Sequence, residues 1–199
     1  MTDRQVKTRQ KLIQAVGTVL AKDGFKGLGI NKIAKTAGVD KVLVYRYFNG
    51  LPGLVAAYSE TVDFWPSAGE VMGPDPQAIR ALEPDMQMAH FFKSFLAALR
   101  RRPLTQDILA WELLERNELS KQLEQRRAHT ALEFFEQLEA LPDDENLPAI
   151  LALMAGAVNY LIVKSRISCS AGSIDLGSDS GWDRIDKGID LLLKGVFTR

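Results

Sequence analysis

The sequence is poor in the residues that most often build metal and covalent sites. It contains one cysteine, Cys169, and two histidines, His90 and His129, among 199 residues. A single cysteine excludes a disulfide framework and a cluster of zinc-binding thiolates, and the histidines are too few and too far apart to suggest a metal site. The chain also lacks a glycine-rich phosphate loop, a metal-ligand spacing and a nucleophile motif. We therefore expect no metal, no cofactor and no enzyme activity.

Long apolar runs are also scarce. We expect no run of the roughly 18–20 residues that cross a membrane. The first residues, MTDRQVKTRQK, are charged where a signal peptide needs an apolar segment. These absences predict a soluble, cytoplasmic protein with no membrane partner, and 46% hydrophobic content is enough for a substantial core.

Charge of either sign is not in excess overall, but it is unevenly distributed. The formal net charge is zero, yet residues 1–50 carry ten Lys or Arg and three Asp, a net charge of +7, and the remaining 149 residues carry −7. Such asymmetry is typical of a polyanion-binding segment joined to a body with another task. The alternative is a solvated basic helix face without a partner.

Apolar residues recur at helical spacing along nearly the whole chain. Thr2 and Gln5 have the spacing of a capping box, and Gly24 ends the first helix. Further helices are expected over residues 30–37, 41–48, 51–65, 85–101, 104–116, 118–140, 148–166 and 182–197, with at most a short helical turn near 77–82. The Ser/Gly-rich segment 168–181 is expected to be a loop, and no pair of strands is expected anywhere. The predicted fold class is all-α, with about nine helices.

Residues 33–45 have the spacing of a helix-turn-helix. Ala34 is a small residue where two short helices would cross, and Gly38, four positions later, tolerates the positive φ of a tight turn. Val44 is then expected to pack back on Ile33 and Ala34. A helix-turn-helix places its second helix in the major groove of DNA. An ordinary αα-hairpin has similar small residues, but the basic charge of this part of the chain favours DNA.

The same region resembles the N-terminal domain of the TetR (tetracycline-repressor-like) family of transcriptional regulators. The residues that carry the resemblance are Gly24-Phe25, Ile33-Ala34, Ala37-Gly38-Val39, Tyr45, Tyr47-Phe48 and Leu54. The resemblance in sequence is specific over about residues 5–65. Beyond them, only the arrangement of the expected helices is similar. The resemblance implies a DNA-binding domain at 1–50, a connecting helix at 51–65, and a helical body at 66–199. In the family, the body binds a small-molecule inducer and forms a homodimer through its last two helices.

Two positions depart from the family pattern. Leu28-Gly29 stands where members usually have Thr or Ser at the start of the second helix, and Leu51 stands where they usually have Lys at the start of the fourth. The amide of Gly29 can still donate to a phosphate at a helix N-terminus. We expect lower general affinity for DNA more than lower specificity, because phosphate contacts position a protein while base contacts specify.

Directions along the third helix suggest the roles of its side chains. Val44 and Phe48 are expected to face the core, and Tyr45 to pack its ring inward with its hydroxyl aimed at a phosphate. Arg46 is the candidate for a bidentate contact to guanine. Val42 or Leu43 is the candidate for contact with a thymine methyl. For Arg46 a phosphate clamp or a solvated side chain is the alternative, and for Lys32 a solvated face or loose phosphate contact is expected. The predicted DNA-binding residues are Gly29, Lys32, Lys41, Val42, Leu43, Tyr45, Arg46 and Tyr47.

The aromatic residues of the body lie at helical spacing, so each is first of all a candidate for the core. Asn159 and Tyr160 are exceptions in an otherwise apolar run over 150–163. A buried polar group there needs a partner in a neighbouring helix, a second subunit or a ligand. Any inducer is expected to be small and largely hydrophobic. The residues predicted to bind it are Phe92, Phe95, Trp111, Glu112, Phe134, Asn159 and Tyr160.

The last two expected helices are too apolar to be left exposed. Small residues in the first permit close approach, and the second carries a matching apolar stripe. We expect a four-helix interface across a two-fold axis, with a contact inside one protomer as the alternative. The predicted dimerisation residues are Ala152, Ala155, Gly156, Ile185, Ile189, Leu192, Leu193 and Val196.

Together these features predict a ligand-responsive, homodimeric transcriptional repressor. Its two recognition helices, about one DNA turn or roughly 34–36 Å apart, would read a palindromic operator in double-stranded DNA. One alternative is an architectural or cell-division DNA-binding protein controlled by a protein partner. A second is a helical enzyme acting on a phosphorylated substrate.

Overall fold

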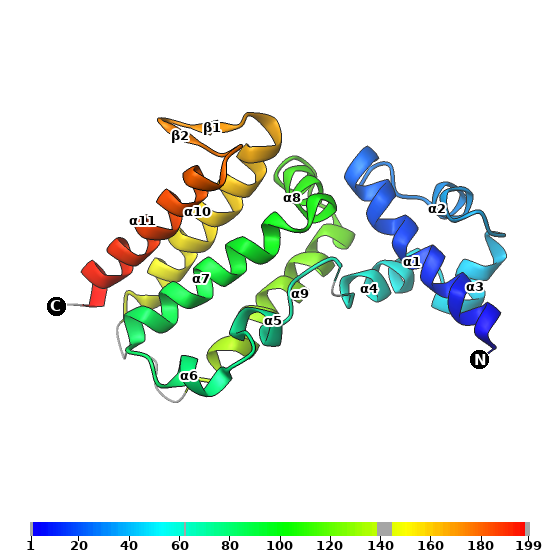
Figure 1. Ribbon diagram of the computed structural model, residues 1–199. Helices are drawn as coiled ribbons and strands as arrows, with labels where there is room; N and C mark the ends of the chain where they lie inside the picture. The colour runs from blue at the N-terminus through cyan, green and yellow to red at the C-terminus, as the bar shows by residue number, and fades with distance from the viewer. Residues whose placement is uncertain (1, 62, 139–144, 198–199) are drawn as a thin grey trace. The chain divides into compact units, whose positions relative to one another are not determined.

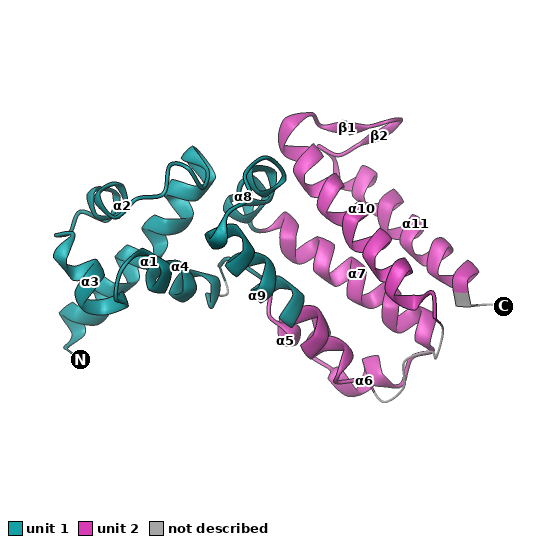
Figure 2. Ribbon diagram, turned by 180° about the vertical axis from the view of Figure 1, so that it is seen from behind, with its two compact units in different colours: residues 1–65, 102–129 teal, residues 66–101, 130–199 magenta. Residues whose placement is uncertain are grey.

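The computed structural model describes residues 2–61, 63–138 and 145–197. These residues form eleven helices and one short hairpin, so the all-α prediction is confirmed (Figure 1). The helices group into two compact units (Figure 2). Unit 1 comprises residues 1–65 and 102–129, and unit 2 comprises residues 66–101 and 130–199. The division into a DNA-binding domain at 1–50 and a body at 66–199 stays a prediction.

Helix α1 (Asp3–Asp23) is the central helix of unit 1. It begins with the predicted capping box, in which Thr2 and Gln5 each accept a hydrogen bond from the backbone amide of the other. Its inner face is fully covered, since Leu12, Val16 and Leu20 are 0% exposed. Against it pack α2 (Ile30–Ala37), α4 (Leu51–Ser59) and α8 (Pro103–Leu114). Burial of this face is the main source of stability of the unit.

Helix α4 follows α3 (Val42–Phe48) and approaches it very closely. A Cβ atom added to Gly53 would lie 1.9 Å from the carbonyl oxygen of Phe48, so only glycine fits at this position. The helix ends at Ser59, whereas the sequence predicts residues 51–65, of which residue 62 lies outside the described part. The hydroxyls of Ser59 and Thr61 donate to the carbonyls of Ala56 and Tyr58 at 2.8 and 2.7 Å. Such bonds compete with the helical ladder.

Helix α7 (Pro84–Arg100) is the central helix of unit 2. It packs against α5 (Ala68–Met72), α6 (Pro76–Arg80), α10 (Leu147–Ile167) and α11 (Asp179–Phe197). The ring of Phe91 lies 4.8–5.8 Å, centroid to centroid, from those of Phe92, Phe95, Phe134 and Phe135. Helix α9 (Glu118–Phe135) contributes its first residues to unit 1 and its last to unit 2.

Two further features of the helices differ from those expected from the sequence. Helix α5 is not predicted by the sequence pattern; Ser67 Oγ caps it by accepting from the amide of Glu70 at 3.1 Å. Helix α9 ends at Phe135 instead of residue 140. The amides of Gln137 and Leu138 donate three residues back, in a turn instead of a continued α-helix. Residues 139 and 140 lie outside the described residues.

The segment between α10 and α11 contains a hairpin where the sequence predicts only a loop. Strand β1 (Ser170–Ala171) pairs antiparallel with β2 (Ile174–Asp175), and Gly172 turns the chain with a φ of 58°. A glycine in a two-residue connection is the usual signal for such a hairpin. The strands are only two residues long, which is too short to show alternation in the sequence.

Helix α10 is apolar but poorly covered. It has 21 residues, and 28% of its most apolar window is buried. By length and composition it is able to cross a membrane, so the expectation that no apolar run reaches that length is wrong. Core helices of soluble proteins reach the same length and apolarity, so these two properties do not distinguish a membrane span from a core helix. The structure does establish that α10 presents an apolar surface.

Replacing Gly53 with alanine is expected to destabilise the protein. The added methyl has to push α4 away from the Phe48 carbonyl, and overpacking of this kind costs about 1–3 kcal/mol. Denaturant unfolding followed by circular dichroism measures the change in stability. Gly69→Ala is the matched control, because a Cβ there meets nothing nearer than Ser67 Oγ at 3.9 Å. Equal effects of the two substitutions would contradict the steric argument.

Candidate DNA-binding interface

Helices α2 and α3 and the turn between them form a helix-turn-helix. Gly38 has φ 66° and ψ 37°, and its amide donates to the carbonyls of Ala34 and Lys35. The amide of Val39 also donates to Ala34 O, at 3.0 Å. Asp40 Oδ1 then accepts from the amide of Val42 at 2.8 Å, which caps the start of α3. The turn predicted from Gly38 is confirmed.

The inner side of the helix-turn-helix is closely packed. Ile33 and Val44 are 0% exposed, and Ala34 and Phe48 are buried as well. The guanidinium of Arg9, on α1, lies 4.9 Å from the centroid of the Phe48 ring. The predicted inward positions of Val44 and Phe48 are confirmed, and they fix the rotation of α3 about its own axis.

The outer side of α3 is formed by Lys41, Val42, Tyr45 and Arg46. All four are exposed, and Val42 and Tyr45 are each 60% exposed. They lie on one face because residues four apart are neighbours on a helix. The prediction that the Tyr45 ring packs inward is wrong, since the inward positions of this short helix belong to Val44 and Phe48.

Two further residues of α3 reach outward less than expected. Leu43 and Tyr47 are half-buried, and the Tyr47 ring lies edge-on to Phe48 with 6.4 Å between centroids. Their roles as DNA contacts stay predictions.

At the N-terminal side of α2, the backbone of Gly29 is accessible and the side chain of Lys32 forms an ion pair. A Cβ atom added to Gly29, the N-cap residue, would meet nothing within 4 Å. The backbone at this helix start is therefore accessible. Lys32 Nζ lies 3.0 Å from Asp23 Oδ2 at the end of α1, so this lysine has a carboxylate partner within unit 1.

Trp111, predicted to bind a ligand, joins α8 to the end of α1. Its Nε1 donates to the carbonyl of Ala21 at 3.1 Å. Its ring fills the space beside Gly24, where an added Cβ would lie 2.8 Å from two ring atoms. Glu115 Oε2 accepts from the amide of Lys26 at 2.9 Å in the same region. These contacts give Trp111 a structural role within unit 1.

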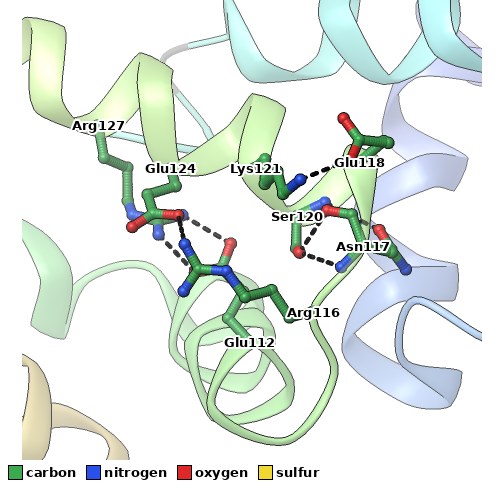
Figure 3. Close-up of polar contacts among 8 residues, drawn as sticks. All are labelled: Glu112, Arg116, Asn117, Glu118, Ser120, Lys121, Glu124 and Arg127. Carbon is green, nitrogen blue, oxygen red and sulfur yellow. Dashed lines mark hydrogen bonds and ion pairs between the residues drawn. The ribbon is translucent and has the colours of Figure 1, made fainter.

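Glu112 is held by an arginine of α9 (Figure 3). Its two carboxylate oxygens lie 2.6 Å from Nη1 and Nη2 of Arg127, whose guanidinium also lies 5.4 Å from the centroid of the Trp65 ring. Burial raises the pKa of Glu112, and the charge and hydrogen bonds of Arg127 oppose that rise. Arg116 and Glu124 form a second ion pair beside it, at 3.0 Å. Glu112 therefore joins α8 to α9.

The other residues predicted to bind a ligand belong to unit 2. Phe92, Phe95 and Phe134 gather around Phe91, which is not among the residues predicted from the sequence. Tyr160 is 59% exposed and so lies at the surface. Asn159 Oδ1 is buried and accepts no hydrogen bond from the part of the chain that the structure describes.

The predicted dimerisation residues divide into covered and exposed ones. Ile189 and Leu193 are buried within the protomer, at 4% and 1% exposure, because α11 packs this edge of its stripe against α7. Ala155, Ile185 and Val196 are half-buried, and Ala152, Gly156 and Leu192 are exposed. Leu153 and Leu191, which are not among the predicted residues, are 75% and 73% exposed. No cluster of His, Cys, Asp or Glu able to hold a metal occurs among the described residues.

Comparison with known proteins agrees with this geometry. Residues 12–58 match the family model of bacterial regulatory proteins, tetR family. No curated protein sequence matches the chain. A solved TetR-like transcriptional regulator from Rhodococcus sp. RHA1 is similar over 100% of both chains, with 18% identity and a TM-score of 0.64.

Two further solved structures have the same fold. The fatty acid degradation regulator FadR from Bacillus halodurans is similar over 92% of this chain and 96% of its own, with 16% identity and a TM-score of 0.61. A TetR family regulator from Marinobacter aquaeolei VT8 covers 98% of this chain and 95% of its own, with 17% identity and a TM-score of 0.60. The chain therefore carries a tetR-family DNA-binding domain at residues 12–58 and has the fold of TetR-family transcriptional regulators.

Proposed function

We propose that the protein is a homodimeric, ligand-responsive transcriptional repressor that binds a palindromic operator. The observation that carries the proposal is the exposed face of α3, with Lys41, Val42, Tyr45 and Arg46 opposite a fully packed inner face. Arg46 offers a bidentate donor for guanine, and Val42 offers methyl groups for thymine. Tyr45 and Lys41 supply donors for phosphate or base edges. This combination suits the major groove better than it suits an ordinary solvated helix face.

The uncovered apolar surfaces of α10 and α11 support the homodimer. Leu153, Tyr160, Leu191 and Leu192 are all between 59% and 75% exposed. Large apolar side chains left exposed on two helices are candidates for an interaction surface. The DNA side calls for the same assembly, because α3 has only seven residues and one such helix reads few bases. A two-fold dimer reads twice as many in a palindrome.

Asn159 Oδ1, which accepts no hydrogen bond from the described residues, supports a ligand. A buried amide oxygen without a donor is costly, so a donor group on an otherwise apolar molecule would stabilise it. The neighbour from Bacillus halodurans is a regulator of fatty acid degradation, which favours an apolar inducer. A ligand of this kind releases DNA by binding better to the dimer state that does not fit the operator.

Selection of bound fragments from genomic DNA of the source organism tests this function. The purified full-length protein, at moderate salt, is expected to enrich a two-fold symmetric site whose half-sites are about one helical turn apart. Uniform, salt-sensitive retention of all fragments would contradict a sequence-specific regulator.

Arg46→Ala is expected to reduce discrimination between the selected site and a scrambled duplex by about 1–3 kcal/mol, because alanine cannot make the bidentate hydrogen bonds to a base. Fluorescence anisotropy on both duplexes measures the difference. Lys35→Ala, an exposed neighbour on α2, is the control and should weaken binding to both duplexes alike or to neither. Equal weakening on both duplexes for Arg46→Ala would make this residue a phosphate contact.

Leu153→Glu is expected to shift a dimer toward monomer, because each leucine that an interface buries contributes about 1.5–3 kcal/mol. Sedimentation velocity over a range of concentrations measures the dissociation constant. Leu113→Glu in α8 is the matched control, because both leucines are 75% exposed. A monomeric wild type, or dissociation by the control alone, would refute this interface.

A further inference from the structure

A groove in unit 1 lies outside the face of α3 described above. It has a volume of about 430 Å³ and lies between the first turns of α1 and the helix-turn-helix turn. Its lining residues are Asp3, Arg4, Lys7, Thr8, Lys11, Gly38 and Val39. Three of these seven residues are cationic.

The three cations form a line along α1. Arg4, Lys7 and Lys11 are three and four residues apart, so they occupy one face over two turns of the helix. The first and last are separated by about 10 Å along the axis. Double-stranded DNA carries one negative charge per about 1.7 Å of its axis. A line of this length is able to face several phosphates.

The charges of the groove are mostly uncompensated. Among the described residues that line it, Asp3 is the only acid, and Asp3 Oδ2 pairs with Lys7 Nζ at 2.9 Å. The structure gives Arg4 and Lys11 no carboxylate partner among the described residues. The hydroxyl of Thr8 donates to the carbonyl of Arg4 at 2.8 Å, so it takes part in the helix wall. Within the described part of the chain, the groove thus keeps two free cations and a third shared with Asp3.

The shape favours a polymer over an enclosed small anion. Arg4, Lys7 and Lys11 are all exposed, and the side chain of Lys7 is 71% exposed. Such a groove gives a small anion little burial, whereas a charged strand can lie along it. The Gly38–Val39 wall also lies just before Lys41 and Val42, which begin the reading face of α3.

We propose that this groove binds backbone phosphates of the DNA that α3 reads. The proposal rests on the proposed DNA binding and adds to it a sequence-independent contact made by α1. Arg4 and Lys11 bind phosphate oxygens directly. The ammonium group of Lys7 is shared between Asp3 and a phosphate. These contacts set the position of the domain on the duplex and carry no base information.

The salt dependence of binding tests the groove. The test variant is Arg4→Gln/Lys11→Gln, and the control is Lys22→Gln/Lys26→Gln, which removes two cations from the other end of α1 and the loop after it. Both are compared with the wild-type, full-length protein on the selected duplex and on a scrambled duplex. The negative slope of log K against log salt should become shallower by about 0.9 for each phosphate that the variant no longer neutralises. We expect this change in the test variant on both duplexes, and no change in the control.

Asp3→Asn supplies a test that a folding defect cannot imitate. It frees Lys7 from its ion pair, so binding to both duplexes should tighten and the salt slope should become steeper. Circular dichroism checks that the variants keep the helical content of the wild type. Unchanged or weaker binding by folded Asp3→Asn would count against the groove.

The outcomes separate this proposal from the proposed function. Suppose that the wild type binds DNA and the salt slope becomes shallower equally in the test and control variants, or in neither. Either result refutes phosphate binding by the groove and leaves the proposed repressor function unaffected. If the wild type binds neither duplex, both proposals fail.

Discussion

The contact between Trp111 and the end of α1 is the constraint on which unit 1 depends. The indole occupies the space beside Gly24 that a side chain at residue 24 would need, and that residue has a φ of 67°, which favours glycine. The indole donates to Ala21 O, and Glu115 accepts from the amide of Lys26. Because α1 also provides the packing surface for α2 and α4, helix α8 and the DNA-binding helices form one packed body. A segment ninety residues distant in sequence is thus part of the DNA-binding unit.

This grouping also shows which segments connect the two units. The chain passes between the two units at residues 65/66, 101/102 and 129/130, and the last of these lies inside α9. Within unit 1, the pair formed by Glu112 and Arg127 joins α8 to the first part of α9. The two side chains are only 16% and 10% exposed, and removing one partner of such a pair leaves the other charge without its counter-ion. The proposed ligand, if it altered α9 in unit 2, would act on a helix whose unit 1 part is anchored to α8.

Local spacing predicts the helix-turn-helix, and long-range packing limits what the sequence predicts elsewhere. Ala34, Gly38 and Val44 lie within eleven residues, and a tight turn restricts their geometry, so their spacing indicates two short helices and a turn. The basic charge of residues 1–50 then favours a DNA-binding motif over an ordinary αα-hairpin. The direction of Tyr45 depends on which neighbours fill the inward positions, and a seven-residue helix has room for few. Likewise, the apolar stripe on α11 indicates that these side chains are buried. It does not indicate whether α7 or a second subunit buries them. The stripe therefore assigns Ile189 and Leu193 to a dimer, whereas Leu153 and Leu191 are the exposed residues.

The net charge of residues 1–50 is best interpreted together with the contacts that each acidic side chain makes. Residues 1–50 contain three acids, and each makes a contact inside the domain: Asp3 pairs with Lys7, Asp23 pairs with Lys32, and Asp40 caps α3. Asp3 is the one of the three that lies in the groove beside α1, where it holds part of the charge of Lys7. At physiological salt, charges more than about 8 Å away are largely screened, so distant acids contribute little to the field at those faces. A chain of zero net charge therefore presents a cationic surface at residues 1–50, because ten local cations outnumber three local acids and the more distant acids are largely screened.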